Sequence, residues 1–251
     1  MSAQRVAGEV TGAVHSFDLS TGVDGPGTRF VVFLAGCPLR CQYCHSPDTR
    51  LRRNGTPTTV DALAAEIDRY RRFIAVAGGG VTVSGGEPLM QPRFTTELLR
   101  RCRDAGLHTA LDTSGVLGAR ADDALLDVTD LVLLDIKSGD PRTYRRVTRT
   151  GELAPTLRFG RRLAGRGIPI WVRFVLVPGL TDEPANVAAV ADHAAALDTV
   201  ERVEVLPFHR LGAPRYAALG LPYPLAGTAP PDAALLDRVR SQFRDRGLTV
   251  Y

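Results

Sequence analysis

The chain has 251 residues, of which 44% are hydrophobic, 23% charged and 6% aromatic, and this composition is typical of a soluble globular protein. No stretch reaches the roughly 20 apolar residues that a membrane helix needs, and Glu9 interrupts any secretory signal core, so we expect a cytoplasmic protein. The net charge of +4 is too small to indicate nucleic-acid binding, although it suits docking of an acidic partner protein.

Short β-branched or aliphatic runs alternate with amphipathic helical patterns along most of the chain. The predicted strands are 29–34, 81–84, 109–112, 131–136, 170–177 and 203–206. The predicted helices are 59–75, 93–105, 121–128, 156–164, 184–196 and 233–244. Thr59 and Asp232 suit helix N-caps, while Gly106 and Gly165 suit helix ends.

This alternation of strands and helices indicates an α/β fold. Strands that read as mostly apolar runs suit a parallel sheet covered by helices. A closed eight-unit barrel typically takes about 250 residues, but the segment before residue 29 and the loop 208–231 use much of that length. We therefore predict a single domain over residues 1–251 that forms an incomplete, laterally open (β/α)6 TIM-like barrel.

Residues with unusual chemistry gather directly after the predicted strands. In α/β proteins, sites form at the carboxyl ends of the strands. The segments that lie there are 37–44, 84–88, 112–115, 135–137 and 206–209. We expect them to converge on one functional site.

Three cysteines, Cys37, Cys41 and Cys44, lie within eight residues, whereas Cys102 stands alone in a helical pattern and suits a small buried side chain. In a chain without an export signal, such clustering favours metal binding over disulfides. The run from Cys41 to His45 matches a c-type haem motif, but haem attachment leaves Cys37 unused. A structural zinc site lacks a well-placed fourth ligand. A four-iron cluster on three thiolates keeps one iron open, which suits catalysis.

The cysteine spacing, with an aromatic residue before the third cysteine, resembles the signature of the radical S-adenosylmethionine (SAM) superfamily. The resemblance is strongest to the pyruvate formate-lyase activating enzymes, and it implies a barrel of the radical SAM type. The matching segments are 15–17, 23–27, 36–45, 78–82, 84–87, 111–113, 129–132, 134–135, 137, 177–179 and 206–209.

The resemblance implies a [4Fe–4S] cluster on Cys37, Cys41 and Cys44, with SAM bound at the open iron and cleaved to a 5′-deoxyadenosyl radical. The residues that it places around SAM are Tyr43, Cys44, His45, Gly86, Asp135, Ile136, Lys137 and His209. Gly86 suits this role because a backbone without Cβ can approach a ligand closely, although a tight turn explains the glycines equally well. Lys137, the only lysine among 31 basic residues, offers a compact ammonium to ligand oxygens.

Two further sites follow from the resemblance alone. Asp112, Thr113 and Asp135 match a monovalent-cation site, for which oxygen ligands are suitable, and helix capping is the alternative role for such aspartates. Asp24 and Arg173 match contacts to the incoming substrate, although the sequence around Asp24 also suits an ordinary turn.

The implied substrate is a glycyl-radical enzyme, by default pyruvate formate-lyase, which loses the Cα hydrogen of one glycine. The implied electron donor is a flavodoxin-like or ferredoxin-like protein, and the mild positive charge suits an acidic donor. We expect a monomer without nucleic-acid or membrane partners. The alternatives are the activating enzyme of another glycyl-radical enzyme, a radical SAM enzyme that acts on a small molecule, such as a deazapurine-forming synthase, and a metal- or haem-binding module.

Overall fold

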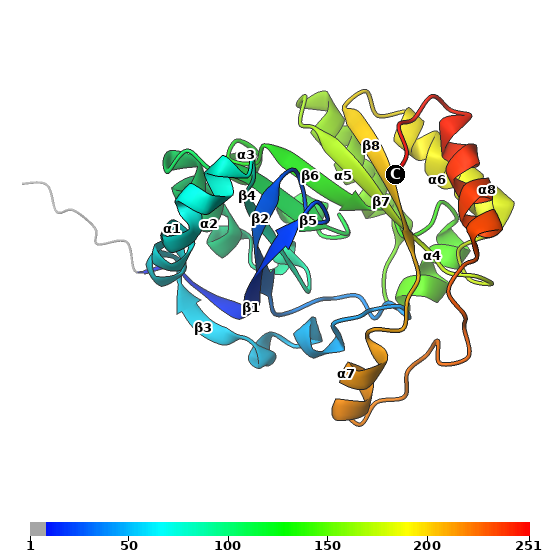
Figure 1. The fold of residues 1–251 in the computed structure, drawn as a ribbon, viewed down its shortest axis with the longest axis horizontal. Coiled ribbons are helices and arrows are strands. Elements are labelled where there is room, and N and C mark those ends of the chain that lie inside the picture. Colours follow the sequence, from blue (N-terminus) through cyan, green and yellow to red (C-terminus); the bar gives the residue numbers. More distant parts are fainter. Residues whose placement is uncertain (1–8) are drawn as a thin grey trace, which may run out of the picture.

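The computed structural model describes residues 9–251, through which one eight-stranded sheet runs (Figure 1). Six neighbouring strands are parallel and follow chain order: β2 (Thr28–Leu34), β4 (Gly80–Gly85), β5 (His108–Thr113), β6 (Leu131–Asp135), β7 (Ile170–Leu176) and β8 (Val200–Pro207). They are the six predicted strands, with bounds that differ by three residues or fewer. The sheet ends at β8 without closing, so the open, incomplete α/β barrel is confirmed.

Two antiparallel strands at the other end of the sheet were not predicted. β1 (Thr11–Thr21) pairs with β2, and β3 (Thr56–Thr59) pairs with β1. The expectation that the segment before residue 29 lies outside the sheet is therefore wrong for β1. A bulge between Val14 and Ser16 interrupts the regular pairing, and such an irregularity blurs the two-residue period that marks a strand in a sequence.

Six helices correspond to the predicted ones: α1 (Val60–Val76), α2 (Pro92–Asp104), α3 (Asp123–Leu126), α5 (Leu153–Gly165), α6 (Pro184–Ala195) and α8 (Ala233–Arg244). Thr59 and Asp232 are confirmed as N-caps, because each side chain accepts a backbone N–H of the first turn. Gly106, with φ at +78°, follows Ala105, the C-cap of α2. α5 ends at Gly165 as expected, but the left-handed residue is Gly167.

The other helical segments were missed. They are α4 (Pro141–Thr148), α7 (Ala213–Ala218) and the 3-10 turns η1 (Pro47–Arg50), η2 (Arg52–Asn54), η3 (Pro88–Met90) and η4 (Gly118–Arg120). α7 lies within the segment 208–231, which was expected to be loop throughout. α4 and α7 lie on the same side of the molecule in Figure 1, below the sheet, where the connections after β2 and β8 run. No helix within residues 9–251 is both long and apolar enough to cross a membrane.

The two faces of the parallel sheet differ in polarity. The side chains that pack against the helices form the main core and include Phe30, Val32, Val81, Val83, Val172 and Phe174. Their neighbours along the strands are buried on the other face and include Arg29, Thr82, Arg173 and Glu204. The strands therefore alternate between apolar and polar side chains more than the predicted apolar runs implied. Charged side chains line the barrel interior beneath the site.

Candidate functional site

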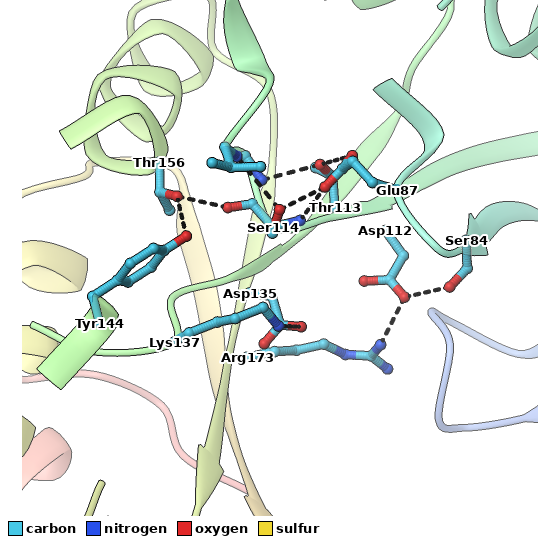
Figure 2. A network of polar contacts seen from close by, with 12 residues as sticks. Ser84, Glu87, Asp112, Thr113, Ser114, Asp135, Lys137, Tyr144, Thr156 and Arg173 are labelled. Atoms are coloured by element: carbon cyan, nitrogen blue, oxygen red, sulfur yellow. Dashed lines mark hydrogen bonds and ion pairs between the residues drawn. The ribbon is translucent and has the colours of Figure 1, made fainter. Parts of the chain in front are cut away.

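The predicted site segments converge at the carboxyl edge of the parallel strands, where Figure 2 shows a network of polar contacts. Ser84, next to the last residue of β4, lies beside Asp112 of β5, and its hydroxyl donates to Asp112 Oδ2 at 2.6 Å. Asp135, at the end of β6, accepts from Lys137 Nζ at 2.7 Å. Parallel neighbours align these ends, so residues distant in sequence share one edge of the sheet.

Arg173 of β7 is the hub of the interior charges. Its guanidinium lies 3.3 Å from Asp112 Oδ2, 3.0 Å from Glu204 Oε2 and 3.5 Å from Asp24 Oδ1. It also donates to the carbonyl of Val23, so the turn between β1 and β2 is fastened to the barrel interior. The structure thus brings Asp24 and Arg173 together, and each already has a partner within the chain. Their predicted contact with the substrate remains a prediction.

Asp112 is the acid whose titration is most altered in the site. Burial raises its pKa to about 6, although Arg173 and the Ser84 hydroxyl act in the opposite direction. Asp112 Oδ2 is engaged by Ser84 and Arg173, and the role of Asp112 as a cation ligand remains a prediction. The Thr113 hydroxyl, predicted for the same ion, donates instead to Glu87 at 2.6 Å. Within residues 9–251, no three histidine, cysteine, aspartate or glutamate side chains are placed to share one metal ion.

Lys137 and Asp135 form a buried pair next to Tyr43. The Lys137 side chain is 9% exposed, and its ammonium lies 5.5 Å from the centre of the Tyr43 ring. Burial lowers the pKa of Lys137, but the Asp135 carboxylate, together with Tyr43 and Cys41, raises it by more, and the pKa lies well above its ordinary value. Lys137 therefore carries a positive charge at neutral pH. The Tyr43 hydroxyl and Asp135 Oδ1 are buried without a hydrogen-bond partner.

Glu87 was missed by the sequence analysis as a site residue. Its carboxylate is 1% exposed and accepts from the Thr113 hydroxyl, from the Ser114 hydroxyl at 2.6 Å and from the Ser114 N–H at 3.1 Å. It thereby joins the turn after β4 to the turn after β5 (Figure 2). Glu87 directly follows Gly86, so its place in the strand-end segment 84–88 was the available signal.

The cysteine loop, residues 36–45, is held by backbone contacts on two sides. The Gly36 N–H donates to the Thr49 carbonyl at 2.7 Å, and the Cys37 N–H donates to the Arg50 carbonyl at 3.0 Å. On the other side, the N–H groups of Arg40 and Gln42 donate to carbonyls at the C-terminal end of α4, both at 2.9 Å. The loop is therefore shaped by η1 and α4, neither of which was predicted.

The three cysteines of this loop are free thiols, and Cys41 is buried. Burial raises the pKa of Cys37 to about 12 and that of Cys41 to about 11. Both thiols are thus protonated at neutral pH unless a metal centre provides compensating positive charge. Cys102 lies in α2 within the main core, as predicted for a small buried side chain.

The residues present suit an iron–sulfur cluster with a polar ligand. Thiolates are the ligands of such clusters, and the loop supplies three sulfurs with no disulfide between them. Buried polar atoms normally have hydrogen-bond partners, and the Tyr43 hydroxyl and Asp135 Oδ1 have none, so both are available to a polar ligand.

The other predicted SAM contacts lie around the same edge with different surroundings. A Cβ at Gly86 would stand 2.3 Å from the Gly36 carbonyl oxygen, so the glycine is required by packing against the cysteine loop. The Ile136 side chain belongs to the main core, which leaves only its backbone for a ligand. The rings of His45 and His209 are exposed, with centroids 6.1 Å apart. These contacts remain predictions.

Residues 31–190 match the family model described as the radical SAM superfamily. This range contains the cysteine loop, most of β2 and the whole of β4, β5, β6 and β7. The chain belongs to the radical SAM superfamily. Membership in this superfamily implies a [4Fe–4S] cluster and SAM as cofactors, and it favours the cluster interpretation of the cysteines over haem or zinc.

Curated relatives narrow the family within the radical SAM superfamily. The chain is 39% identical to the pyruvate formate-lyase 1-activating enzyme of Escherichia coli K12 over 96% of this chain and 98% of the relative. It is 42% identical to the pyruvate formate-lyase-activating enzyme of Listeria monocytogenes over 89% and 92% of the two chains. The predicted membership in the family of pyruvate formate-lyase activating enzymes is confirmed.

Solved radical SAM structures show the same fold. A domain of the pyruvate-formate lyase-activating enzyme of Bacteroides vulgatus is 26% identical, with a TM-score of 0.58 over 69% of this chain and 98% of that one. A radical SAM methyltransferase of Sphaerobacter thermophilus is 19% identical, with a TM-score of 0.64 over 99% and 74%. The second likeness concerns the fold only, because the identity is low.

Proposed function

We propose that this protein activates a glycyl-radical enzyme, with pyruvate formate-lyase as the expected substrate. The observation that carries the proposal is the 39% identity to an activating enzyme of that name along nearly the whole length of both chains. The cysteine loop and the orphaned polar atoms beside it support the same function, because they provide for a cluster and a polar ligand at one edge of the sheet.

The proposed roles follow the positions of the side chains. Cys37, Cys41 and Cys44 hold a [4Fe–4S] cluster. When bound, the cluster and SAM supply the reductive cleavage that yields a 5′-deoxyadenosyl radical, which takes the Cα hydrogen of the target glycine. Lys137, fixed by Asp135, offers its charge to an anionic group of SAM.

Further contacts to SAM complete this proposal. Tyr43 and Asp135 provide the unpartnered oxygen atoms, and Gly86, Ile136, His45 and His209 border the ligand. Asp112, Thr113 and Asp135 are proposed to bind a monovalent cation when the Arg173 contact to Asp112 loosens. Asp24 and Arg173 are proposed to receive the substrate, since the turn that they fasten opens onto the barrel interior.

The partners and organisation belong to the same proposal. A flavodoxin-like or ferredoxin-like protein donates the electron, and the protein acts as a cytoplasmic monomer without nucleic-acid or membrane partners. A single domain over residues 1–251 is supported by the one continuous sheet and its shared core over the described residues.

Anaerobic reconstitution with iron, sulfide, SAM and a reductant tests the function. Pyruvate formate-lyase is added, 5′-deoxyadenosine is quantified and the glycyl radical is measured by electron paramagnetic resonance (EPR). We expect both products, and we expect Ala substitution of Cys37, Cys41 or Cys44 to abolish them. Cys102→Ala is the matched control and should retain both, because Cys102 lies on α2 and its thiol is buried in the main hydrophobic core.

The two products separate the alternatives. 5′-Deoxyadenosine without a glycyl radical on pyruvate formate-lyase would overturn the proposed substrate and favour another glycyl-radical enzyme or a small molecule. Absence of 5′-deoxyadenosine from an iron-loaded preparation would overturn the proposed chemistry.

A further inference from the structure

Arg50, the last residue of η1, joins the cysteine loop to α7. One of its terminal nitrogens, Nη2, donates to the Cys41 carbonyl at 3.3 Å and to the Tyr216 hydroxyl at 2.5 Å. The guanidinium carbon lies 5.2 Å from the centre of the Tyr216 ring, within the range of a cation–π contact. Arg50 Nε is buried without a hydrogen-bond partner. The side chain is therefore held in place by contacts at its tip.

Tyr216 is the fixed end of this connection. It is 2% exposed, and its ring lies 5.0 Å from that of Tyr223. Burial raises the pKa of Tyr216 to about 12, so the phenol is neutral at physiological pH, and its hydroxyl oxygen accepts a hydrogen bond from the Arg50 guanidinium. Tyr216 therefore fixes the position of the Arg50 guanidinium but does not neutralise its charge.

The segment around α7 packs directly on the cysteine loop. A Cβ at Gly212 would stand 2.7 Å from His45 Cα, so no other residue fits there without a shift of the backbone. Arg215 of α7 donates to the Ser46 hydroxyl at 2.7 Å. Because these contacts flank the Arg50–Tyr216 connection, α7 and the loop behave as one packed unit.

The charge of Arg50 is not balanced locally. Its contacts within residues 9–251 are a carbonyl, a hydroxyl and an aromatic ring, none of which carries a formal negative charge. The guanidinium contacts the Cys41 carbonyl at 3.3 Å, so the charge of Arg50 lies directly beside the cysteine loop. A fixed positive charge beside an iron–sulfur site stabilises the more negative, reduced state of the cluster.

We infer that Arg50 is a positioning residue that anchors the cysteine loop to α7 and holds an unbalanced positive charge beside the cluster site, which makes the cluster easier to reduce. This inference rests on the proposed function, because it concerns the cluster that the function requires. It assigns to one arginine, among 30 in the chain, a specific influence on the redox step.

A redox titration of the reconstituted cluster, followed by EPR, tests the charge. Arg50→Met removes the charge and keeps an unbranched side chain, Arg50→Lys keeps the charge, and Arg53→Met removes the charge of an exposed arginine three positions along the chain. We expect Arg50→Met to lower the ratio of reduced to oxidised cluster about tenfold at a fixed potential, which is about 59 mV for a one-electron couple. Arg50→Lys and Arg53→Met should stay close to the wild type.

A chelator challenge tests the anchoring independently of the charge. Tyr216→Phe removes the hydroxyl that holds Arg50, whereas Tyr223→Phe removes a hydroxyl from the adjacent ring. We expect iron release from Tyr216→Phe to be several-fold faster than from wild type, with Tyr223→Phe unchanged. If Arg50→Met does not fold, the chelator challenge with the tyrosine variants still tests the anchoring.

The wild-type protein distinguishes a failure of the proposed function from a failure of the role of Arg50. If wild-type protein binds no cluster or does not cleave SAM, the proposed function fails. If wild-type protein does both, the inference is overturned by an unchanged potential in iron-loaded Arg50→Met, by an equal shift in Arg53→Met, or by equal iron release from the two tyrosine variants.

Discussion

Glu87 illustrates how a single buried carboxylate organises the site without touching a basic residue. It accepts hydrogen bonds from the Thr113 and Ser114 hydroxyls and from two backbone N–H groups, at Ser114 and Leu89. These hydrogen bonds stabilise the buried carboxylate without an ion pair, because hydrogen bonds to an ionised acceptor are stronger than those between neutral groups. The turns after β4 and β5 therefore depend on one side chain.

Glu87→Gln should lower the free energy of unfolding by about 2 kcal/mol, because an amide nitrogen faces donors that need an acceptor. Urea denaturation measures this change. The matched control is Glu97→Gln in α2, where the carboxylate pairs with Arg100 and both side chains are 38% exposed. That exposed pair should contribute only about 0.3 kcal/mol. Equal effects of the two substitutions would contradict the role assigned to Glu87.

Sequence reasoning found the site residues whose position follows from the fold and missed those whose role follows from contacts. Asp112, Asp135 and Lys137 stand at strand ends, so predicting the parallel sheet was enough to bring them together. Arg50 is one of 30 arginines, and nothing in its local sequence indicates that its tip reaches Tyr216, 166 positions later in the chain.

At the scale of elements, α4 is the helix on which the shape of the cysteine loop depends. Its last turn offers the carbonyls of Val147 and Thr148 to N–H groups of the loop. Its N-cap is Asp140, whose side chain accepts the Thr143 N–H at 2.7 Å. We therefore expect that a weaker cap destabilises the whole helix, including its last turn, which holds the cysteine loop.

Asp140→Ala should destabilise the protein by about 1 kcal/mol and should accelerate iron release to a chelator from the reconstituted protein. Asp122→Ala is the matched control, because Asp122 caps α3 in the same way at 2.9 Å. Within residues 9–251, α3 makes no backbone hydrogen bond to the cysteine loop. This control substitution should cost similar stability without affecting iron release. Identical iron release from both variants would show that α4 does not hold the loop.

The stability difference between wild type and Asp140→Ala should depend on pH. Hydrogen bonds from the Thr143 N–H lower the pKa of Asp140 below its ordinary value of 3.8. A lowered folded-state pKa stabilises the native state above the unfolded value, and this stabilisation disappears as the pH falls through the folded value. The difference in unfolding free energy should thus be constant well above pH 3.8 and should vanish well below it. A difference that grows on acidification would contradict the cap.

The elements that the sequence analysis missed are those whose pattern is short or irregular. β1 carries a bulge and a largely exposed second half, so its alternation is weak. α7 spans only six residues and is defined by packing against the cysteine loop. α4 had a usable signal, because Asp140 followed by Pro141 is a common helix start, but its eight residues fall below the usual length for recognition.

At the scale of the whole molecule, the N-terminal end of the barrel is closed by stacked side chains. Trp171 of β7, the only tryptophan, donates to Glu201 at 2.8 Å. The Arg202 guanidinium lies 3.2 Å from the centre of the Trp171 ring and 4.9 Å from that of Tyr251. The last residue of the chain thus packs on Arg202 and pairs with β8. Trp171 lies two residues before Arg173 on β7, so one strand contributes both to this end and to the charged interior.

Because the sheet and its core are continuous, urea unfolding of the barrel should be a single cooperative transition. Trp171 fluorescence reports the N-terminal end of the barrel, and far-ultraviolet circular dichroism reports all helices and strands. We expect the two transitions to superimpose. A fluorescence change that precedes the loss of circular dichroism would contradict one cooperative unit.

The replacement of lysine by arginine throughout the chain, with Lys137 as the exception, has a practical consequence. An acylating reagent that reacts with primary amines and spares guanidinium groups meets a single side-chain target, buried against Tyr43 and Asp135. A second acyl group, beyond the one on the terminal amine, therefore reports that the Lys137 ammonium site is accessible to solvent.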